Sequence, residues 1–162
     1  MQGNSMRICK IIMASFFIIL FVGCGNSVKR TRFYPSDWTK EFVTTYSDDT
    51  IFIYKVDREK TQSKLVMKLY KFQGNYYTDD MGEDRKMVMS NSMEFDTLYS
   101  DDMNYLPHRI IVENAGNNLM SSSIFNEDVN TYLELKLVYD INYDIKYIQD
   151  WSPYITYTPV PE

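Results

Sequence analysis

An alternation of apolar and polar residues near the C-terminal end constrains the fold more than any other feature of the sequence. Apolar side chains occupy every odd position of residues 133–147, and polar or charged side chains occupy the even positions, with Val138 as the exception. A period of two is that of a β-strand with one face buried and the other in water. A single strand of this length would span about 50 Å, so we expect a break near 140–142 or one long bent strand.

Shorter strand signals recur along the rest of the chain. Tyrosine, which suits half-buried strands, occurs 14 times. Turn-forming residues at 73–75 and 114–118 separate apolar stretches. These signals predict a mainly β domain, a small antiparallel barrel or sandwich of about 8–10 strands. Besides the 133–147 region, the predicted strands cover residues 51–56, 65–70, 76–77, 87–89, 93–99, 109–113, 119–125 and 154–157.

One segment carries the signal of a helix start. In residues 35–43, either Ser36 or Asp37 can cap a helix, and the apolar residues Trp38 and Phe42 are spaced four apart. We therefore expect one short helix at the N-terminal side of the β domain.

The first 24 residues have the order of a secretion signal. A short basic segment at 6–10 precedes an uncharged apolar run at 11–22, and a small residue stands before Cys24. As a helix, residues 11–23 would span about 20 Å, whereas a bilayer core is about 30 Å thick. A permanent transmembrane anchor is therefore disfavoured, and a cleaved signal peptide is predicted.

The end of this segment carries a more specific motif. Phe21-Val22-Gly23-Cys24 resembles the lipobox of bacterial lipoproteins, whose usual form is Leu-(Ala/Ser)-(Gly/Ala)-Cys. Gly23 and Cys24 match the two most constrained positions, Val22 is an accepted variant, and Phe21 departs from the usual Leu. The resemblance implies cleavage between Gly23 and Cys24 and a lipid on the Cys24 sulfur. Two or more acyl chains, such as palmitate, anchor a protein stably at about 0.8 kcal/mol per buried methylene.

The lipobox resemblance also implies a division of the chain and a location. Residues 1–23 would be the signal peptide, residues 24–34 the lipidated cysteine and a tether, and residues 35–162 a single β-rich domain. The expected location is the bacterial cell envelope. An Asp directly after the lipidated cysteine would resemble a signal that retains a lipoprotein in the inner membrane. This chain has Gly25 at that position. We therefore expect the outer membrane, with the domain facing the periplasm.

The charge of the chain argues against nucleic acid as a partner. The residues after the signal peptide include 15 basic and 22 acidic side chains, a net charge of −7. Binding to phosphates requires clustered Lys and Arg. The charge is uneven, with +4 over residues 25–75 and −11 over residues 76–162. In the predicted tether, Lys29, Arg30 and Arg32 either contact anionic lipid headgroups or are simply solvated.

Few side chains point to catalysis or to a metal ion. His108 is the only histidine, no Gly-x-Ser-x-Gly motif occurs, and we expect His108 in an exposed loop or at a strand edge. A zinc site would need several Cys or His ligands. Residues 79–84 hold four carboxylates without the EF-hand order, which leaves a calcium loop and a solvated hairpin tip as alternatives. We predict no catalytic residue, no metal site and no cofactor.

Together these observations predict a membrane-anchored, non-enzymatic envelope lipoprotein whose β domain binds a protein, peptide or lipid partner. Two alternatives stay open. In a barrel that carries a lipophilic ligand, the inward odd positions of 133–147 would line a void. A carboxylate-based hydrolase of envelope polymers would need two acids that face each other across a cleft, about 5–10 Å apart.

Overall fold

The chain forms antiparallel β-structure throughout the part that the computed structural model describes, residues 28–35, 40–79, 85–99, 107–127, 132–150 and 155–160. Twelve strands follow one another along these segments. They are β1 (Lys29–Tyr34), β2 (Lys40–Ser47), β3 (Thr50–Asp57), β4 (Gln62–Phe72), β5 (Asn75–Thr78), β6 (Lys86–Met89), β7 (Phe95–Tyr99), β8 (His108–Gly116), β9 (Leu119–Asn126), β10 (Tyr132–Asp140), β11 (Ile145–Asp150) and β12 (Thr156–Pro159).

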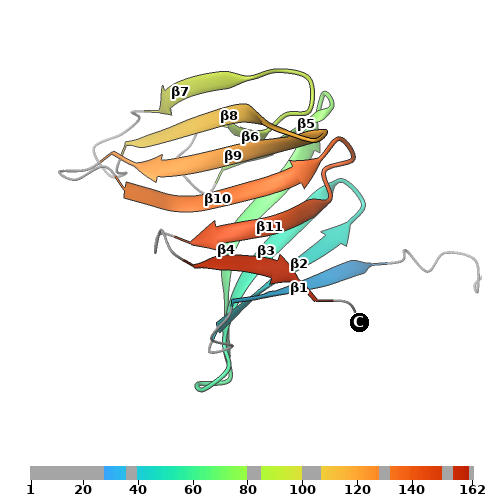
Figure 1. Ribbon diagram of the computed structural model, residues 1–162, viewed down its shortest axis with the longest axis vertical. Coiled ribbons are helices and arrows are strands. Elements are labelled where there is room, and N and C mark those ends of the chain that lie inside the picture. Colours follow the sequence, from blue (N-terminus) through green and yellow to red (C-terminus); the bar gives the residue numbers. More distant parts are fainter. Residues whose placement is uncertain are drawn as a thin grey trace, which may run out of the picture.

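The twelve strands belong to one sheet that curls into a nearly closed barrel (Figure 1). Its order is β6-β5-β4-β3-β2-β1-β12-β11-β10-β9-β8-β7, so β1 pairs with β12 and joins the two halves of the chain. The strands β6 and β7 form the two edges, and β6 packs near β8 and β9 across the seam without a ladder. The predicted mainly β fold is confirmed, and of the two predicted architectures the barrel is the one formed, with twelve strands in the described residues in place of the 8–10 predicted.

The predicted helix is wrong over its second half. Residues 36–39 lie outside the described residues, but Lys40 already begins β2. This strand pairs with β1 on one side and with β3 on the other. Phe42 points into the core, and the β-branched residues that follow it favour a strand. Pairing on both sides therefore overrides the helix-like spacing of the apolar residues.

The predicted tether is wrong from Lys29 onward. Residues 29–34 form β1, which lies between β2 and β12 and closes the barrel. Phe33 is fully buried in the core. The sequence before Phe33 is too polar to suggest a strand, because β1 gains its stability from pairing with two strands and not from an apolar pattern.

The long alternating segment does contain a break near the predicted position. β10 ends at Asp140 and β11 begins at Ile145. The odd positions do not all point inward, because Ile141 lies at the turn and is 59% exposed. A β-bulge in the β10–β11 pairing then moves the inward position from Tyr147 to Ile148.

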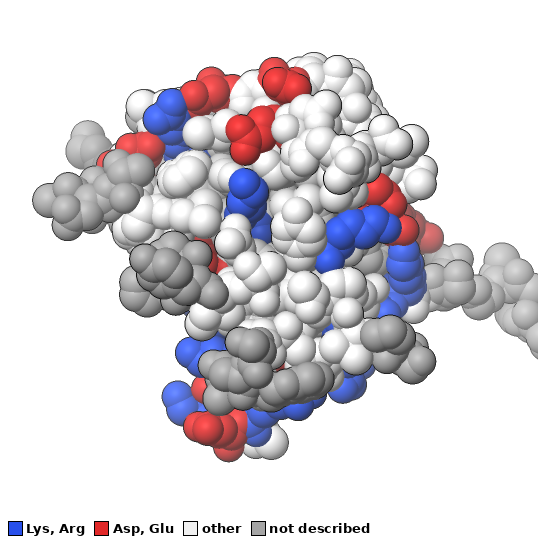
Figure 2. All heavy atoms as spheres, in the orientation of Figure 1, with Lys and Arg blue, Asp and Glu red and all other residues white. Residues whose placement is uncertain are grey.

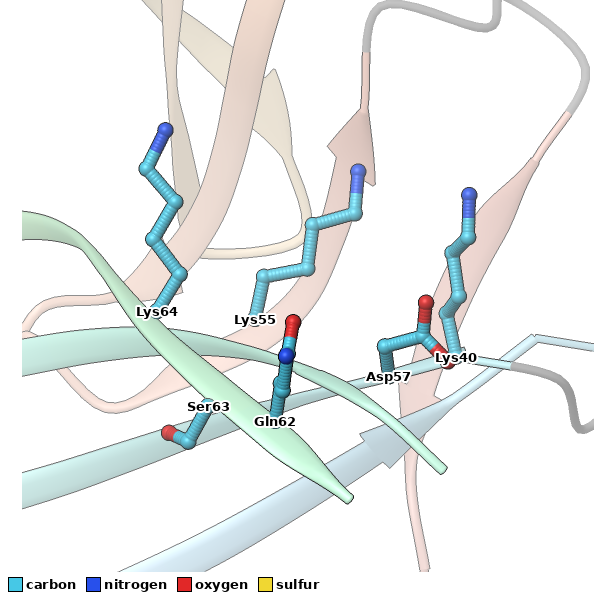
Figure 3. Close-up of a pocket in the computed structure, with 6 residues that line it drawn as sticks. All are labelled: Lys40, Lys55, Asp57, Gln62, Ser63 and Lys64. Carbon is cyan, nitrogen blue, oxygen red and sulfur yellow. The ribbon is translucent and has the colours of Figure 1, made fainter. Parts of the chain in front are cut away.

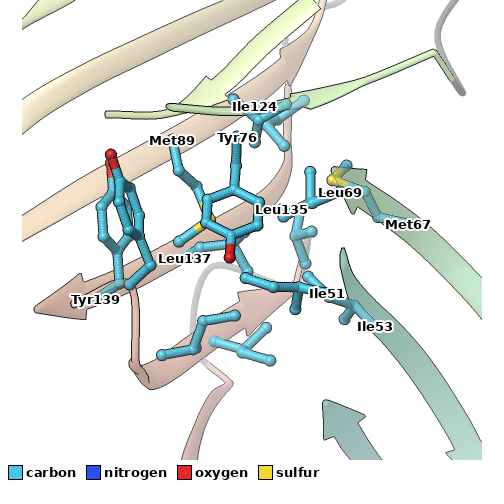
Figure 4. Packing of buried hydrophobic residues seen from close by; sticks show 14 of the residues in the cluster. Ile51, Ile53, Met67, Leu69, Tyr76, Met89, Ile124, Leu135, Leu137 and Tyr139 are labelled. Carbon is cyan, nitrogen blue, oxygen red and sulfur yellow. The ribbon is translucent and has the colours of Figure 1, made fainter. Parts of the chain in front are cut away.

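Apolar side chains from both halves of the sheet meet inside the barrel and form one core (Figure 4). Tyr139 and Tyr143 stack with their ring centroids 5.7 Å apart, and Tyr76 meets Tyr143 edge-on at 4.9 Å. The buried cluster comprises Phe33, Phe42, Ile51, Ile53, Met67, Leu69, Tyr76, Val88, Met89, Ile110, Val112, Ile124, Leu135, Leu137, Tyr139, Tyr143, Ile145, Ile148 and Tyr157.

The two ends of the barrel differ. One end, here the turn end, carries short turns at residues 48–49, 73–74, 117–118 and 141–144, together with the start of β1. The strands run from there to the opposite end, here the mouth, which contains the start of β2, the end of β3, the start of β4, the start of β8 and the end of β11. The core cluster lies between the two ends. Polar side chains that point inward at the mouth therefore lie directly above the last apolar residues of the core.

Candidate functional site at the mouth of the barrel

Three lysines line one wall of the mouth, on three adjacent strands. Lys55 lies opposite Phe42 in the pairing of β2 with β3, and opposite Lys64 in the pairing of β3 with β4. Directly paired residues share a face of the sheet, so Lys55 and Lys64 lie on the same inner face as the core residue Phe42. Lys40, two residues before Phe42, shares that face. Figure 3 shows the three side chains side by side, with their amino groups pointing the same way.

These lysines border a pocket of about 370 Å³. Asp57 and Gln62 face it from the ends of β3 and β4, and Figure 3 shows both side chains on the same side of the strands as the lysines. A volume of this size is at the lower end of pockets that hold small molecules. The complete lining is Lys40, Lys55, Asp57, Gln62, Ser63 and Lys64.

The opposite wall of the mouth supplies acidic partners. The ammonium group of Lys55 forms an ion pair with Asp150 at the end of β11. Three strands separate β3 from β11 in the sheet, so this contact crosses the mouth and does not follow a ladder. The charge of Lys64 also acts on Glu134 of β10. The ion pair of Lys55 with Asp150 and the longer-range attraction between Lys64 and Glu134 thus connect the two walls.

His108 lies at this opposite wall and is largely buried. Its Nε2 atom lies 3.2 Å from Oε2 of Glu134, and its side chain is 13% exposed. The hydrogen bond from His108 lowers the pKa of the Glu134 carboxyl group, with Lys64 as a smaller contribution. Nδ1 of His108 is buried and has no hydrogen-bond partner among the described residues. The expectation of an exposed histidine is therefore wrong, although His108 is the first residue of its strand.

The pocket side of the mouth carries an excess of positive charge. The carboxylate of Asp57 accepts a hydrogen bond from the backbone N–H of Lys60 at 3.2 Å and lies 3.5 Å from the Lys60 ammonium group. The backbone bond is the main reason that the pKa of Asp57 is lowered. Within the described residues neither Lys40 nor Lys64 has an ion-pair partner within 4 Å. The ammonium groups of Lys40 and Lys64, on either side of Lys55, are thus available for an anionic group, and lysine binds such groups as a compact point charge.

The sequence did not identify this site. Lysines in alternating strands are usually assigned to the solvated outer face, and only the strand register shows that these three point inward. Ile51 and Ile53 are buried on the same face, and the face becomes polar where β3 leaves the core. The available signal was the change along the alternate positions of β3, which are apolar at Ile51 and Ile53 and charged at Lys55.

The predicted lipidation and cleavage residues, Cys24 and Gly23, lie outside the described residues. So does most of the acidic stretch 79–84, of which only Asp79 is described. In the segments that the structure does describe, no three His, Cys, Asp or Glu side chains gather as a metal site would require. Those same segments contain no helix with the length and apolarity needed to cross a membrane.

Comparison with known proteins returned no match for this chain among protein-family models, curated proteins or solved structures.

Proposed function

We propose that this protein is a lipid-anchored lipoprotein of the bacterial envelope whose barrel binds an anionic group of a ligand or partner at the mouth. The observation that carries the binding proposal is the row of Lys40, Lys55 and Lys64 on the inner face beside the pocket. The lipobox resemblance of residues 21–24 supports the anchor. A carboxylate or a phosphate is the chemistry that such a row recognises.

The proposal is for a binding protein and not for an enzyme. A glycoside-cleaving pair needs one carboxyl group with a raised pKa as the acid. At the mouth, the pKa values of Glu134 and Asp57 are lowered by hydrogen bonds, and Asp150 is held by Lys55. Glu134 and Asp57 are therefore unsuited to donating a proton at neutral pH, and the contact of Asp150 with Lys55 serves to orient that lysine.

The lipophilic-carrier alternative receives less support. It requires the inward positions of the long alternating segment to line a void. Leu135, Leu137 and Tyr139 are instead at most 2% exposed and pack into the core cluster with residues of β3, β4 and β9 (Figure 4). The polar mouth is consequently the better candidate for a ligand.

The mouth is tested by titrating the full chain with inorganic phosphate and, separately, with succinate. Because His108 is the only histidine, its imidazole Hε1 proton gives one resolved NMR signal at the mouth. We expect saturable shifts of that signal with at least one of the two probes. The shifts should weaken at least several-fold in the Lys40→Gln/Lys64→Gln double variant and persist in Lys71→Gln, a matched change near the turn end of β4. Shifts that are absent for both probes, or equal in both variants, would refute binding at the lysines.

The anchor is tested separately by feeding producing cells a clickable palmitate analogue. The full-length chain should take up the label and sediment with membranes, and Cys24→Ala should lose both properties. A label that persists in Cys24→Ala, or a wild-type chain that is never labelled, would remove the lipoprotein part of the proposal without affecting the mouth.

A further inference from the structure

The outer face of the N-terminal half of the sheet is unusually apolar and aromatic. Cross-strand pairing places Arg30, Thr45, Phe52 and Lys68 in one row across β1–β4, and Arg32, Val43, Tyr54 and Leu65 in the next row. A third row continues through Thr50, Tyr70 and Tyr77 to Met87. These side chains point away from the core, since their sequence neighbours Phe33, Ile51, Ile53 and Leu69 are buried inside. These three rows and Phe72 make up the outer face of β1–β5.

This surface departs from what the solvated side of an antiparallel sheet usually carries, which is mostly polar side chains. Leu65 and Phe72 are 42% and 43% exposed. The rings of Tyr70 and Tyr77 stack at 6.4 Å, and Phe72 meets Tyr77 edge-on at 6.0 Å. Exposed apolar and aromatic side chains that cluster on one face mark an interaction site in many proteins.

A shallow hollow of about 180 Å³ lies on the same face. Val43, Tyr54 and Val56 line it together with Arg30. Apolar side chains beside a guanidinium group suit a molecule with an acidic head and a hydrocarbon portion. The remaining lining residues are Thr45 and Ser63.

The charge on this face is basic. Arg30, Arg32 and Lys68 lie among the apolar side chains, and the guanidinium group of Arg85 lies 5.0 Å from the ring centroid of Phe72. Among the described outward positions of β1–β4 the one acidic residue is Glu41, which is 5% exposed and paired with Arg58 at 3.1 Å. Asp79 approaches the face at its far edge, beside Tyr70.

The opposite half of the barrel carries more acid. Figure 2 looks onto the β7–β11 side and shows acidic side chains gathered along its upper part, with basic side chains mainly across the middle and lower parts. Asp96 on β7 and Glu113 on β8 are exposed carboxylates there, paired with Arg109 and Lys136, and β7–β11 hold five acidic and three basic residues in all. A negatively charged surface would therefore meet the face of β1–β5 more favourably than the face of β7–β9.

We infer that the outer face of β1–β5 rests on an anionic lipid surface. Aromatic rings with interspersed Arg and Lys are the side chains that favour the boundary between lipid headgroups and acyl chains. The inference rests in part on the proposed anchor: if Cys24 is lipidated, only residues 25–28 separate it from Lys29, and these five steps along the chain reach at most about 17 Å. Arg30, the next residue of β1, is then held close to the headgroups.

The test compares two exposed leucines, one in each half of the sheet. Leu65→Cys on β4 and Leu98→Cys on β7 are each labelled with the fluorophore NBD, in a full-length Cys9→Ser/Cys24→Ser background. The chains are reconstituted into vesicles of phosphatidylcholine with 30% phosphatidylglycerol, or of phosphatidylcholine alone, where the apolar run at 11–22 provides the attachment. Because Cys24 is absent, the outcome does not depend on lipidation.

In the anionic vesicles we expect a blue shift of the label at position 65 and quenching by brominated lipids, with neither effect at position 98. The shift should decrease in neutral vesicles and in Arg30→Glu/Arg32→Glu, while Arg30→Lys/Arg32→Lys retains it. Circular dichroism confirms that each variant is folded. Equal signals at both positions, a shift that ignores lipid charge, or a shift without vesicles, which indicates self-association, would each overturn the inference.

Discussion

The phenol oxygen of Tyr139 accepts a hydrogen bond from the backbone N–H of Ser90 at 3.0 Å and donates one to the Ser90 carbonyl at 2.9 Å. Tyr139 belongs to β10, whereas Ser90 directly follows the edge strand β6. The neighbouring Asn91 N–H donates in the same way to the hydroxyl of Tyr143 at 3.0 Å, and that hydroxyl donates to the Gly74 carbonyl. Two tyrosines therefore satisfy backbone groups at the seam, where the ladder is interrupted.

Removing the Tyr139 hydroxyl should weaken the whole barrel. Tyr139→Phe leaves a buried N–H and a buried carbonyl of Ser90 without partners, and each such group costs about 1–3 kcal/mol. We expect the free energy of unfolding to fall by about 2–4 kcal/mol in urea titrations. Tyr147→Phe on β11 serves as the control and should change it by less than about 0.5 kcal/mol. Equal urea midpoints for the two variants would show that the seam does not need this bond.

Alkaline pH should unfold the protein through its buried tyrosines. Burial raises the pKa of Tyr46 to about 12, although its hydroxyl accepts a bond from the Ile145 N–H, and burial also raises the pKa of Tyr139. A raised pKa means that the unfolded chain releases the proton first, so the stabilising effect is complete below about pH 10 and is lost above it.

The free energy of unfolding should thus be steady up to about pH 9 and fall between pH 10 and 12, by up to about 1.4 kcal/mol per pH unit for each tyrosine. Urea midpoints at several pH values, with absorbance at 295 nm to follow ionisation, measure this dependence. Tyr46→Phe should make the slope shallower. A slope that Tyr46→Phe leaves unchanged would assign the alkaline loss to other groups.

The sequence predicted the β class because its strongest patterns are local. The alternation of residues 133–147 and the turn at 73–75 correspond to β10, β11 and the β4–β5 hairpin. What it missed depends on distant pairing. Residues 29–34 lack an apolar pattern and become a strand only between β2 and β12, which is separated from them by most of the chain.

The candidate site was harder to foresee for a related reason. Phe52 and Tyr54 belong to an apolar run that indicates a buried strand, yet they face outward, whereas Lys55 faces inward. The alternation of odd and even positions does not by itself show which face of β3 is the inside, because both faces carry apolar residues. The register with Phe42 decides it, and register depends on the assembled sheet.

The ion pair across the mouth should stabilise the barrel measurably. The side chains of Lys55 and Asp150 are 28% and 14% exposed, so removing one partner leaves a poorly solvated charge on the other. We expect Asp150→Asn to lower the free energy of unfolding by about 1–3 kcal/mol. A double-mutant cycle with Lys55→Gln should give a coupling of about 1 kcal/mol or more, which falls with added salt.

The exposed pair of Arg109 and Asp96, 2.6 Å apart on β8 and β7, provides the comparison. Its two side chains are 44% and 48% exposed, and exposed pairs contribute at most about 1 kcal/mol. The coupling of Lys55 with Asp150 should therefore be the larger of the two. A coupling near zero for the mouth pair would mean that water or another group replaces the lost partner without cost.

The hydrogen bond between His108 and Glu134 should be visible in the titration of the carboxylate. His108→Phe keeps a ring of similar size but removes the donor, so the pKa of the Glu134 carboxyl group should rise toward its ordinary value. A lowered pKa stabilises the fold above the unfolded-state pKa and loses that effect as the pH falls. The stability difference between wild type and His108→Phe should accordingly shrink below about pH 4.

Carbon-13 NMR of the glutamate and aspartate carboxyl carbons measures the change, with Glu134→Gln to assign the Glu134 signal. Asp57 is the internal control, because its lowered pKa comes mainly from the Lys60 backbone and should not change in His108→Phe. If the Glu134 pKa stays low without the imidazole, then Lys64, whose charge also lowers that pKa, is the stronger partner. In that case Lys64→Gln should raise the pKa instead, and the lysine would be engaged by the opposite wall and less available to an anionic ligand.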